Sequence, residues 1–227
     1  MDMIRNVFRQ KNFMFKLGIV ICLLWVVVAI LAPLIAPQDP LLQNLDARFQ
    51  PPSASHWFGT DSLGRDVFSR VLYGSRISIT AGLITVLVSF GIGILYGALA
   101  GYAGGLLDDI LMRISEMIQS FPPLILAMVI AAAMGPSIVN SVFAMAIIWW
   151  PNYARLTRSR LMGASRARIL FKEILPNSIG PLVVMSTLDL GNAILMFSGL
   201  SFLGLGVQPP VAEWGAMVSD GVATFQN

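Results

Sequence analysis

The stretch LGIVICLLWVVVAILAPLIA, Leu17–Ala36, contains twenty consecutive residues without a charge. Twenty residues of α-helix rise about 30 Å, which matches the hydrocarbon thickness of a bilayer. A secretory signal peptide has a shorter apolar core, of about 7–15 residues, which ends at a cleavage site with small residues. The stretch therefore predicts a retained transmembrane helix, preceded by a basic tail at residues 1–16.

The overall composition indicates a membrane protein. Of the 227 residues, 56% are hydrophobic and only 12% are charged, and the mean hydropathy is +0.75. Soluble domains contain about 25% charged residues, so lipid is expected to surround most of this chain. We therefore predict an all-α polytopic membrane protein with five transmembrane helices and an external loop over residues 37–76. The four further spans are expected at Ile77–Gly101, Ile114–Met134, Ser137–Trp150 and Ile179–Gly206.

Proline, glycine and charged residues refine the third and fourth spans. Pro122-Pro123 predicts a kink within the third span, and Gly135-Pro136 predicts a turn before the fourth. A short polar break is expected before the third span, where four charged residues follow one another closely: Asp108, Asp109, Arg113 and Glu116.

Glycines recur every four residues in the second span, at Gly93, Gly97 and Gly101. Residues at this spacing lie on one helix face, where glycines let another backbone approach closely. A glycine face that lines a pore is the alternative. At the end of the fourth span, Trp149-Trp150 and Tyr153 are typical of the aromatic belt at a membrane surface.

The distribution of Lys and Arg indicates the orientation, because cytoplasmic segments of membrane proteins carry the excess of these residues. With the N-terminus inside, eleven of the fifteen Lys and Arg residues face the cytoplasm. Six of these lie between Arg155 and Lys172. The external loop, residues 37–76, holds the other four, and four aspartates offset them. The sequence thus predicts a cytoplasmic N-terminus.

Several kinds of chemistry lack the residues they need. None of the three lysines is followed by Ser or Thr, so the chain has no P-loop for ATP. His56 is the single histidine and Cys22 the single cysteine, which leaves no zinc site. Ser55, His56 and Asp61 are neighbours in sequence, but a catalytic triad is defined by geometry. We therefore expect no catalytic residue, no metal and no cofactor on this chain, and no nucleic acid as partner.

Two acidic residues lie at or near membrane depth. Asp189 interrupts the fifth span, where a carboxylate costs about 2.5–3.5 kcal/mol on insertion scales and should face protein or water. It is predicted either to line a translocation path together with Asn192, or to form a hydrogen bond with Asn192 or with a neighbouring serine. Glu116 is expected to form an ion pair with Arg113, three residues earlier on the same helix.

Other functions stay open at this point. A proton-coupled secondary transporter would use Asp189 and Glu116 and would work without ATP, but such transporters usually contain inverted repeats, and none is visible in the sequence. A membrane-embedded hydrolase would need a positioned nucleophile and base, and a single histidine in the predicted external loop, His56, is a weak candidate for the base. An assembly protein has no positive support in the sequence.

Four segments carry a more specific signal: HWFGTDSLGRDVFSRVLYGSRIS (His56–Ser78), AGYAGGLLDDILMRISEMIQSFP (Ala100–Pro122), GASRARILFKEILPN (Gly163–Asn177) and GLSFLGLGVQPPVAEWGAM (Gly199–Met217). Together they resemble the integral-membrane permease subunits of ABC importers in the dipeptide, oligopeptide and nickel class, the second permease of the pair. The resemblance runs nearly from end to end. It implies a permease transmembrane domain over residues 77–227, with a cytoplasmic coupling loop at about residues 153–177.

In this family the coupling loop follows the pattern E-A-A-x3-G-x9-I-x-L-P. Gly163 matches the glycine, and Leu175-Pro176 match the final pair. Glu173 occupies the position where isoleucine is usual, and Thr157-Arg158-Ser159 do not match E-A-A. Most of the first coupling helix is therefore expected to be missing here.

The coupling loop is expected to dock on an ATPase and to receive mechanical work from it. Its small residues would let the partner approach the backbone, its apolar residues would be buried, Arg166 would pair with an acid, and Pro176 would stop the helix. A basic segment that only sets the orientation is the alternative. The expected docking residues are Gly163, Ala164, Ser165, Arg166, Ile169, Leu170, Phe171 and Pro176.

The resemblance also implies partners. The chain would pair with a homologous permease, two ATPase subunits that bind ATP and Mg, and an external substrate-binding protein, in a bacterial or archaeal plasma membrane. Di- and oligopeptides are the expected substrates, with nickel chelates or opines as alternatives. Trp57 and Trp214 are candidate contacts for the binding protein, although such aromatics are equally typical membrane anchors. Family members carry a sixth membrane helix after the segment Gln208–Asp220, and this helix is expected to be absent here.

Overall fold

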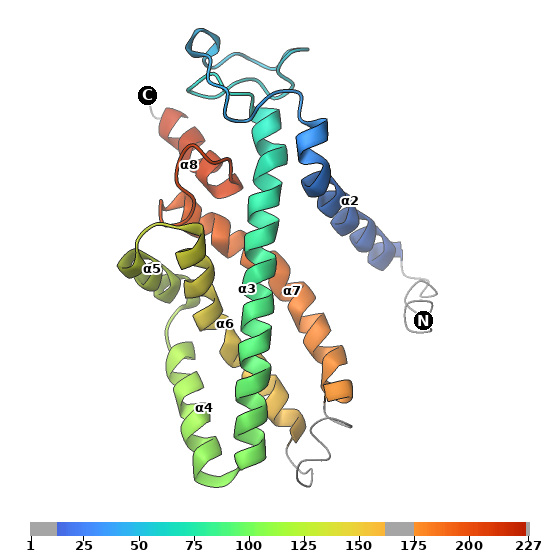
Figure 1. Cartoon of the computed structure of the whole chain (residues 1–227), viewed down its shortest axis with the longest axis vertical. Coiled ribbons are helices and arrows are strands. Elements are labelled where there is room, and N and C mark those ends of the chain that lie inside the picture. The colour runs from blue at the N-terminus through green and yellow to red at the C-terminus, as the bar shows by residue number, and fades with distance from the viewer. Residues whose placement is uncertain (1–12, 162–174, 226–227) are drawn as a thin grey trace. The chain divides into compact units, whose positions relative to one another are not determined.

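The computed structural model describes residues 13–161 and 175–225, and within these ranges the regular structure is helical, apart from one isolated β-bridge between Thr60 and Asp66. The predicted all-α class is confirmed (Figure 1). The chain divides into two compact units, Met1–Ile79 and Thr80–Asn227, and the division falls within the helix Val67–Ala103. The elements are α2 (Phe13–Ile35), η1 (Leu45–Ala47), α3 (Val67–Ala103), α4 (Gly105–Gln119), α5 (Pro123–Met134), α6 (Ile138–Leu161), α7 (Leu175–Phe202) and α8 (Trp214–Phe225).

Three helices in the described ranges are long and apolar enough to cross a membrane: α2 over Lys16–Ile35, α3 over Val67–Ala103 and α7 over Gly180–Phe202. Helices α4 and α5 meet this criterion as a pair, which would make a fourth span, and they are bent by 88°. The remaining predicted span, Ser137–Trp150, forms the first part of α6 but is not apolar enough over a sufficient length. Its helix continues into a polar end that reaches Leu161.

The third predicted span is interrupted where the sequence predicts a kink. Helix α4 ends at Gln119, the chain turns through residues 120–122, and α5 starts at Pro123. A proline in the first turn of a helix needs no backbone N–H, whereas inside a continuous helix it removes a hydrogen bond. The two prolines therefore separate α4 from α5 instead of bending a single helix.

The polar break predicted between Asp108 and Glu116 is wrong, because these residues lie inside α4, which begins at Gly105. Helix α4 is amphipathic: Asp108, Met112 and Ser115 recur at helical spacing and are buried on one face. Charged residues continue a helix without difficulty when they fall on its outer face or find a partner on its inner one. The expected start of this element at Ile114 is corrected accordingly.

The glycine stripe of α3 packs against the backbone of α6, as predicted for Gly93 and Gly97. A Cβ atom at Gly93 would lie 2.6 Å from the carbonyl oxygen of Trp150, and a Cβ atom at Gly97 would lie 2.9 Å from Ala154 Cα. Side-chain carbons do not approach other atoms this closely. The two helices can therefore pack at this distance only because both positions are glycine.

Helix α6 lies at the centre of the second unit. Helices α4, α5 and α7 all pack against it, and α8 packs on α7. Fully buried side chains on α6 and α7 form the core between them: Met145, Tyr153, Leu182, Phe197 and Leu200. Helix α8 has 12 residues, fewer than the roughly 20 needed to span a bilayer.

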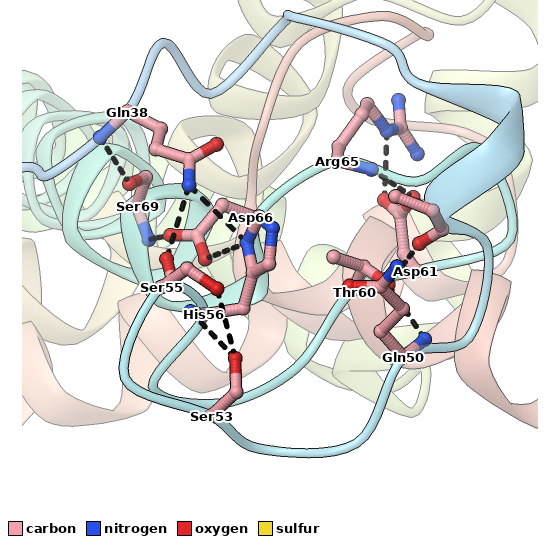
Figure 2. A network of polar contacts seen from close by, with 11 residues as sticks. Gln38, Gln50, Ser53, Ser55, His56, Thr60, Asp61, Arg65, Asp66 and Ser69 are labelled. Atoms are coloured by element: carbon pink, nitrogen blue, oxygen red, sulfur yellow. Dashed lines mark hydrogen bonds and ion pairs between the residues drawn. The ribbon is translucent and has the colours of Figure 1, made fainter.

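In the first unit, the segment between α2 and α3 is ordered by buried polar contacts rather than by regular structure (Figure 2). The Asp61 carboxylate accepts hydrogen bonds from the backbone N–H groups of Leu63 and Arg65 and from Arg65 Nε, the last at 2.7 Å. Asp66 Oδ1 lies 3.0 Å from His56 Nδ1, and the Asp66 side chain is 1% exposed. The predicted external loop is therefore a defined structural element.

Candidate functional site

An ion pair connects the beginning of α4 to the end of α6. Arg158 Nε donates to Asp108 Oδ1, and Arg158 Nη2 donates to Asp108 Oδ2, both over 2.6 Å. The side chains are 27% and 11% exposed, respectively. The hydrogen bonds that Arg158 donates to the Asp108 carboxylate raise the pKa of the guanidinium above its usual value. Paired donors of this kind hold a carboxylate in one orientation as well as attracting it.

A second polar contact connects the other end of α4 to α6. Gln119 Nε2 donates to Asn152 Oδ1 over 2.7 Å, and Arg155 Nη2 donates to the same oxygen over 3.3 Å. Gln119 Oε1 is buried without a hydrogen-bond partner within the described part of the chain, as is Thr157 Oγ1. Unpaired buried oxygens are uncommon in native proteins, and these two belong to residues at opposite ends of the contact, since Gln119 is the last residue of α4 and Thr157 precedes Arg158.

Asp189 of α7 is half-buried and accepts a hydrogen bond from Tyr153 of α6. The distance from Tyr153 Oη to Asp189 Oδ2 is 2.7 Å, and the Tyr153 side chain is fully buried, with Phe90 packed edge-on against its ring. The helix-to-helix hydrogen bond predicted for Asp189 is therefore present, but its partner is a tyrosine instead of Asn192 or a serine. Asn192 is exposed on the surface of α7.

The predicted ion pair on α4 is confirmed. Arg113 Nη1 lies 3.0 Å from Glu116 Oε2, and the two side chains are 77% and 52% exposed. Exposed pairs three or four residues apart on one helix contribute only about 0.2–0.5 kcal/mol. The contact needs no further role to explain it.

Most of the predicted docking residues lie outside the described part of the chain. This holds for the stretch 162–174, which includes Gly163 and all the other docking residues except Pro176. Pro176 lies in the first turn of α7, and the helix that it was expected to stop falls outside the described residues. The described residues closest to this stretch in sequence are the end of α6 and the start of α7.

Three aromatic residues between α2 and the start of α3 form a small cluster. The Trp57 and Phe58 rings lie 4.8 Å and 5.0 Å from the Phe68 ring, and both side chains are more than half exposed. Trp214 is partly buried as the first residue of α8. Trp57 therefore offers an exposed aromatic surface, whereas Trp214 also takes part in packing.

The triad considered for Ser55, His56 and Asp61 is not formed. His56 pairs with Asp66, Ser55 Oγ pairs with Ser53 Oγ, and the Asp61 carboxylate binds arginine (Figure 2). No group of three or more His, Cys, Asp or Glu side chains in the described ranges is placed to share a metal ion.

The pairings of Asp108 and Tyr153 are not readable from the sequence. Asp108 and Arg158 are 50 residues apart, and the pattern indicates only that each is a charged residue next to an apolar stretch. Tyr153 and Trp150 were expected in the aromatic belt, but both are buried against other helices. An aromatic residue near the end of a span is compatible with either environment, and only the neighbouring helices decide between them.

Comparisons with known proteins agree with these features. The family described as "Binding-protein-dependent transport system inner membrane component" matches residues 93–162 and 159–226, and "N-terminal TM domain of oligopeptide transport permease C" matches residues 2–52. The probable D,D-dipeptide transport system permease protein of Escherichia coli (strain K12) is 48% identical over 89% of this chain and 72% of its own length. The dipeptide transport system permease protein of Bacillus subtilis (strain 168) is 41% identical over 95% of this chain and 72% of its own, and the oligopeptide transport system permease protein of that organism is 37% identical over 94% and 74%.

Proposed function

This chain belongs to the family of binding-protein-dependent transport system inner membrane components, as a permease subunit of an ABC importer, and we propose that its cargo is di- and oligopeptides. The observation that carries the choice of substrate is the set of relatives. Those aligned above over most of the chain are named as dipeptide, D,D-dipeptide or oligopeptide permeases. The chain supplies a membrane pathway and carries out no bond chemistry of its own.

The proposed assembly contains a homologous permease, two ATPase subunits that bind ATP and Mg, and an external substrate-binding protein. The large apolar surfaces of α2, α3 and α7 support a location within lipid and against a second permease, since many of their bulky side chains are exposed on the isolated chain. Charge counts support a cytoplasmic N-terminus. Trp57, which is 58% exposed, is the proposed contact for the binding protein.

The proposed coupling loop runs from Gly163 to Pro176 and would dock on the ATPase subunits. It continues directly from the end of α6, where Arg158 is held by Asp108. A short loop can transmit force only if the helix that carries it is itself fixed. The ion pair between α4 and α6 supports this role for the loop.

Asp189 and Asn192 are the proposed lining of the translocation path. They are three residues apart on α7, so they share one face of the helix. Asp189 is half-buried and Asn192 exposed in the isolated chain, and a polar pair at membrane depth is expected to face protein or water instead of lipid. A carboxyl group at this position suits the ammonium group at the start of a peptide.

The test is transport by the purified complex in liposomes, with ATP inside and the binding protein outside. We expect labelled dipeptide to accumulate only when both are present, and accumulation to continue when a protonophore removes the proton gradient. An ATPase variant that binds but does not hydrolyse ATP is the control and should abolish uptake. Uptake that continues with this ATPase variant, or that stops when the protonophore is added, would contradict the proposal.

A further inference from the structure

One face of α4 turns inward, and side chains at both of its ends reach α6. Asp108, Met112, Ser115 and Gln119 recur at intervals of four, three and four residues, which places them on one side of a helix. Asp108 reaches Arg158 at one end of this face, and Gln119 reaches Asn152 at the other. Helix α4 is thus tied to α6 by polar contacts at both ends.

The α3–α4 hairpin belongs to the same group of helices. Tyr96 Oη of α3 donates to the carbonyl oxygen of Leu111 in α4 over 2.9 Å. Helix α3 in turn packs against α6 through Gly93 and Gly97. Figure 1 shows the second half of α3 beside α4, with only a short turn between the two helices. A displacement of α6 is therefore passed to α3 by close packing, and to α4 by side chains.

The position of Asp108 suits an ion pair that joins the two helices. Asp108 is in the first turn of α4, where backbone N–H groups favour an anion. Arg158 lies on α6, close to the last described residue of that helix, Leu161. The paired hydrogen bonds between the two side chains fix their relative orientation in a way that apolar contacts do not.

We propose that Asp108 and Arg158 form a strut that makes α4 move together with the end of α6, so that motion generated by the ATPase subunits reaches the α3–α4 hairpin. The inference rests on the proposed function. Both residues are positioning residues, since neither is assigned to the peptide or to ATP. The strut converts a local movement at one helix end into a movement of the hairpin.

The test measures peptide uptake and ATP hydrolysis in the same liposomes, together with the amount of assembled complex. We expect Asp108→Asn to transport about tenfold fewer peptides per ATP than the wild type, a typical size for coupling between sites, while the complex assembles normally. The double variant Asp108→Arg, Arg158→Asp restores an opposite-charge pair and should recover most of the wild-type ratio. A role in folding alone would change the amount of complex but not the number of peptides per ATP.

Glu116→Gln is the matched control, because it breaks an ion pair on the same helix that is exposed and does not reach α6. It should keep the wild-type ratio. A wild-type ratio in assembled Asp108→Asn overturns the strut. Loss of assembly in Asp108→Asn that the double variant does not repair also overturns it, since it would leave the pair only a structural role. Absence of ATP-driven peptide uptake by the wild type would instead contradict the proposed function.

Discussion

At the scale of single residues, Gly97 determines how closely two helices pack. The atoms that a Cβ would meet belong to the backbone of Ala154, which cannot move away as a flexible side chain could. Gly91 lies on the same helix, and a Cβ there would meet nothing within 4 Å. The two glycines thus differ in packing although the sequence around them is similarly apolar.

Gly97→Ala is expected to lower the free energy of unfolding by about 1–3 kcal/mol, because a carbon forced into a filled contact must push the helices apart. Gly91→Ala is the matched control and should be neutral or slightly stabilising, since alanine is a better helix former than glycine. Thermal denaturation of the purified complex in detergent measures both. Equal stability of the two variants would show that the close approach of α3 and α6 is not needed.

Asp189 combines a packing contact with the proposed path. Asp189→Asn keeps an oxygen that accepts the Tyr153 hydrogen bond, so stability should change little. Peptide uptake should fall about tenfold, the equivalent of one lost hydrogen bond to a charged group. Tyr153→Phe should instead lower the free energy of unfolding by about 1–2 kcal/mol and change peptide uptake little. Liposome uptake and thermal denaturation separate the two effects, and normal uptake by Asp189→Asn would assign the carboxyl to packing alone.

At the scale of elements, the start of α8 is set by one buried acid. Glu213 is fully buried; its Oε1 accepts from Ser198 Oγ over 2.8 Å, and its Oε2 accepts from the backbone N–H of Ala216 over 3.0 Å. The side chain therefore caps α8 and joins it to α7 at the same time. Gly215 allows this approach, since a Cβ there would lie 2.7 Å from Ser198 Cα.

Glu213→Ala is expected to destabilise the contact between α7 and α8 by about 1–3 kcal/mol, because it leaves the part-buried Ser198 hydroxyl and Ala216 N–H group without their acceptor. Amide hydrogen exchange should accelerate throughout α8 and hardly change in α4. Gln208→Ala removes an exposed hydrogen bond in the preceding loop and serves as control. Unchanged exchange in α8 of the Glu213 variant would contradict the capping role.

At the scale of the whole molecule, the orientation in the membrane is a prediction from the placement of charge. It can be tested with single cysteines in a Cys22→Ser background. Ala54→Cys lies in the exposed external segment, and Ser159→Cys lies on the exposed surface at the end of α6. A membrane-impermeant maleimide should label Ala54→Cys in intact cells and should label Ser159→Cys only after permeabilisation. The reverse pattern would place the proposed coupling loop outside and contradict the docking role.

The apolar stretches, the break at Pro122-Pro123 and the glycine contact could all be predicted because each depends on local sequence. A run of apolar residues partitions into lipid whatever its neighbours are, and proline interrupts a helix through its own ring. The extent of α4 was missed for a related reason. Four charges in nine residues suggested a polar break before the helix, but an amphipathic helix accommodates the same charges when Asp108 finds a partner.

Local patterns thus predicted a membrane-embedded helical protein, and the resemblance of four segments pointed to the permease family, which the comparisons show. Tertiary structure alone decided that Asp108 binds Arg158, that Tyr153 binds Asp189, and that Glu213 links α7 to α8. The physical reason is that transfer of a residue into lipid is a property of the residue, whereas a hydrogen bond between residues 15 to 50 positions apart exists only once the helices have packed.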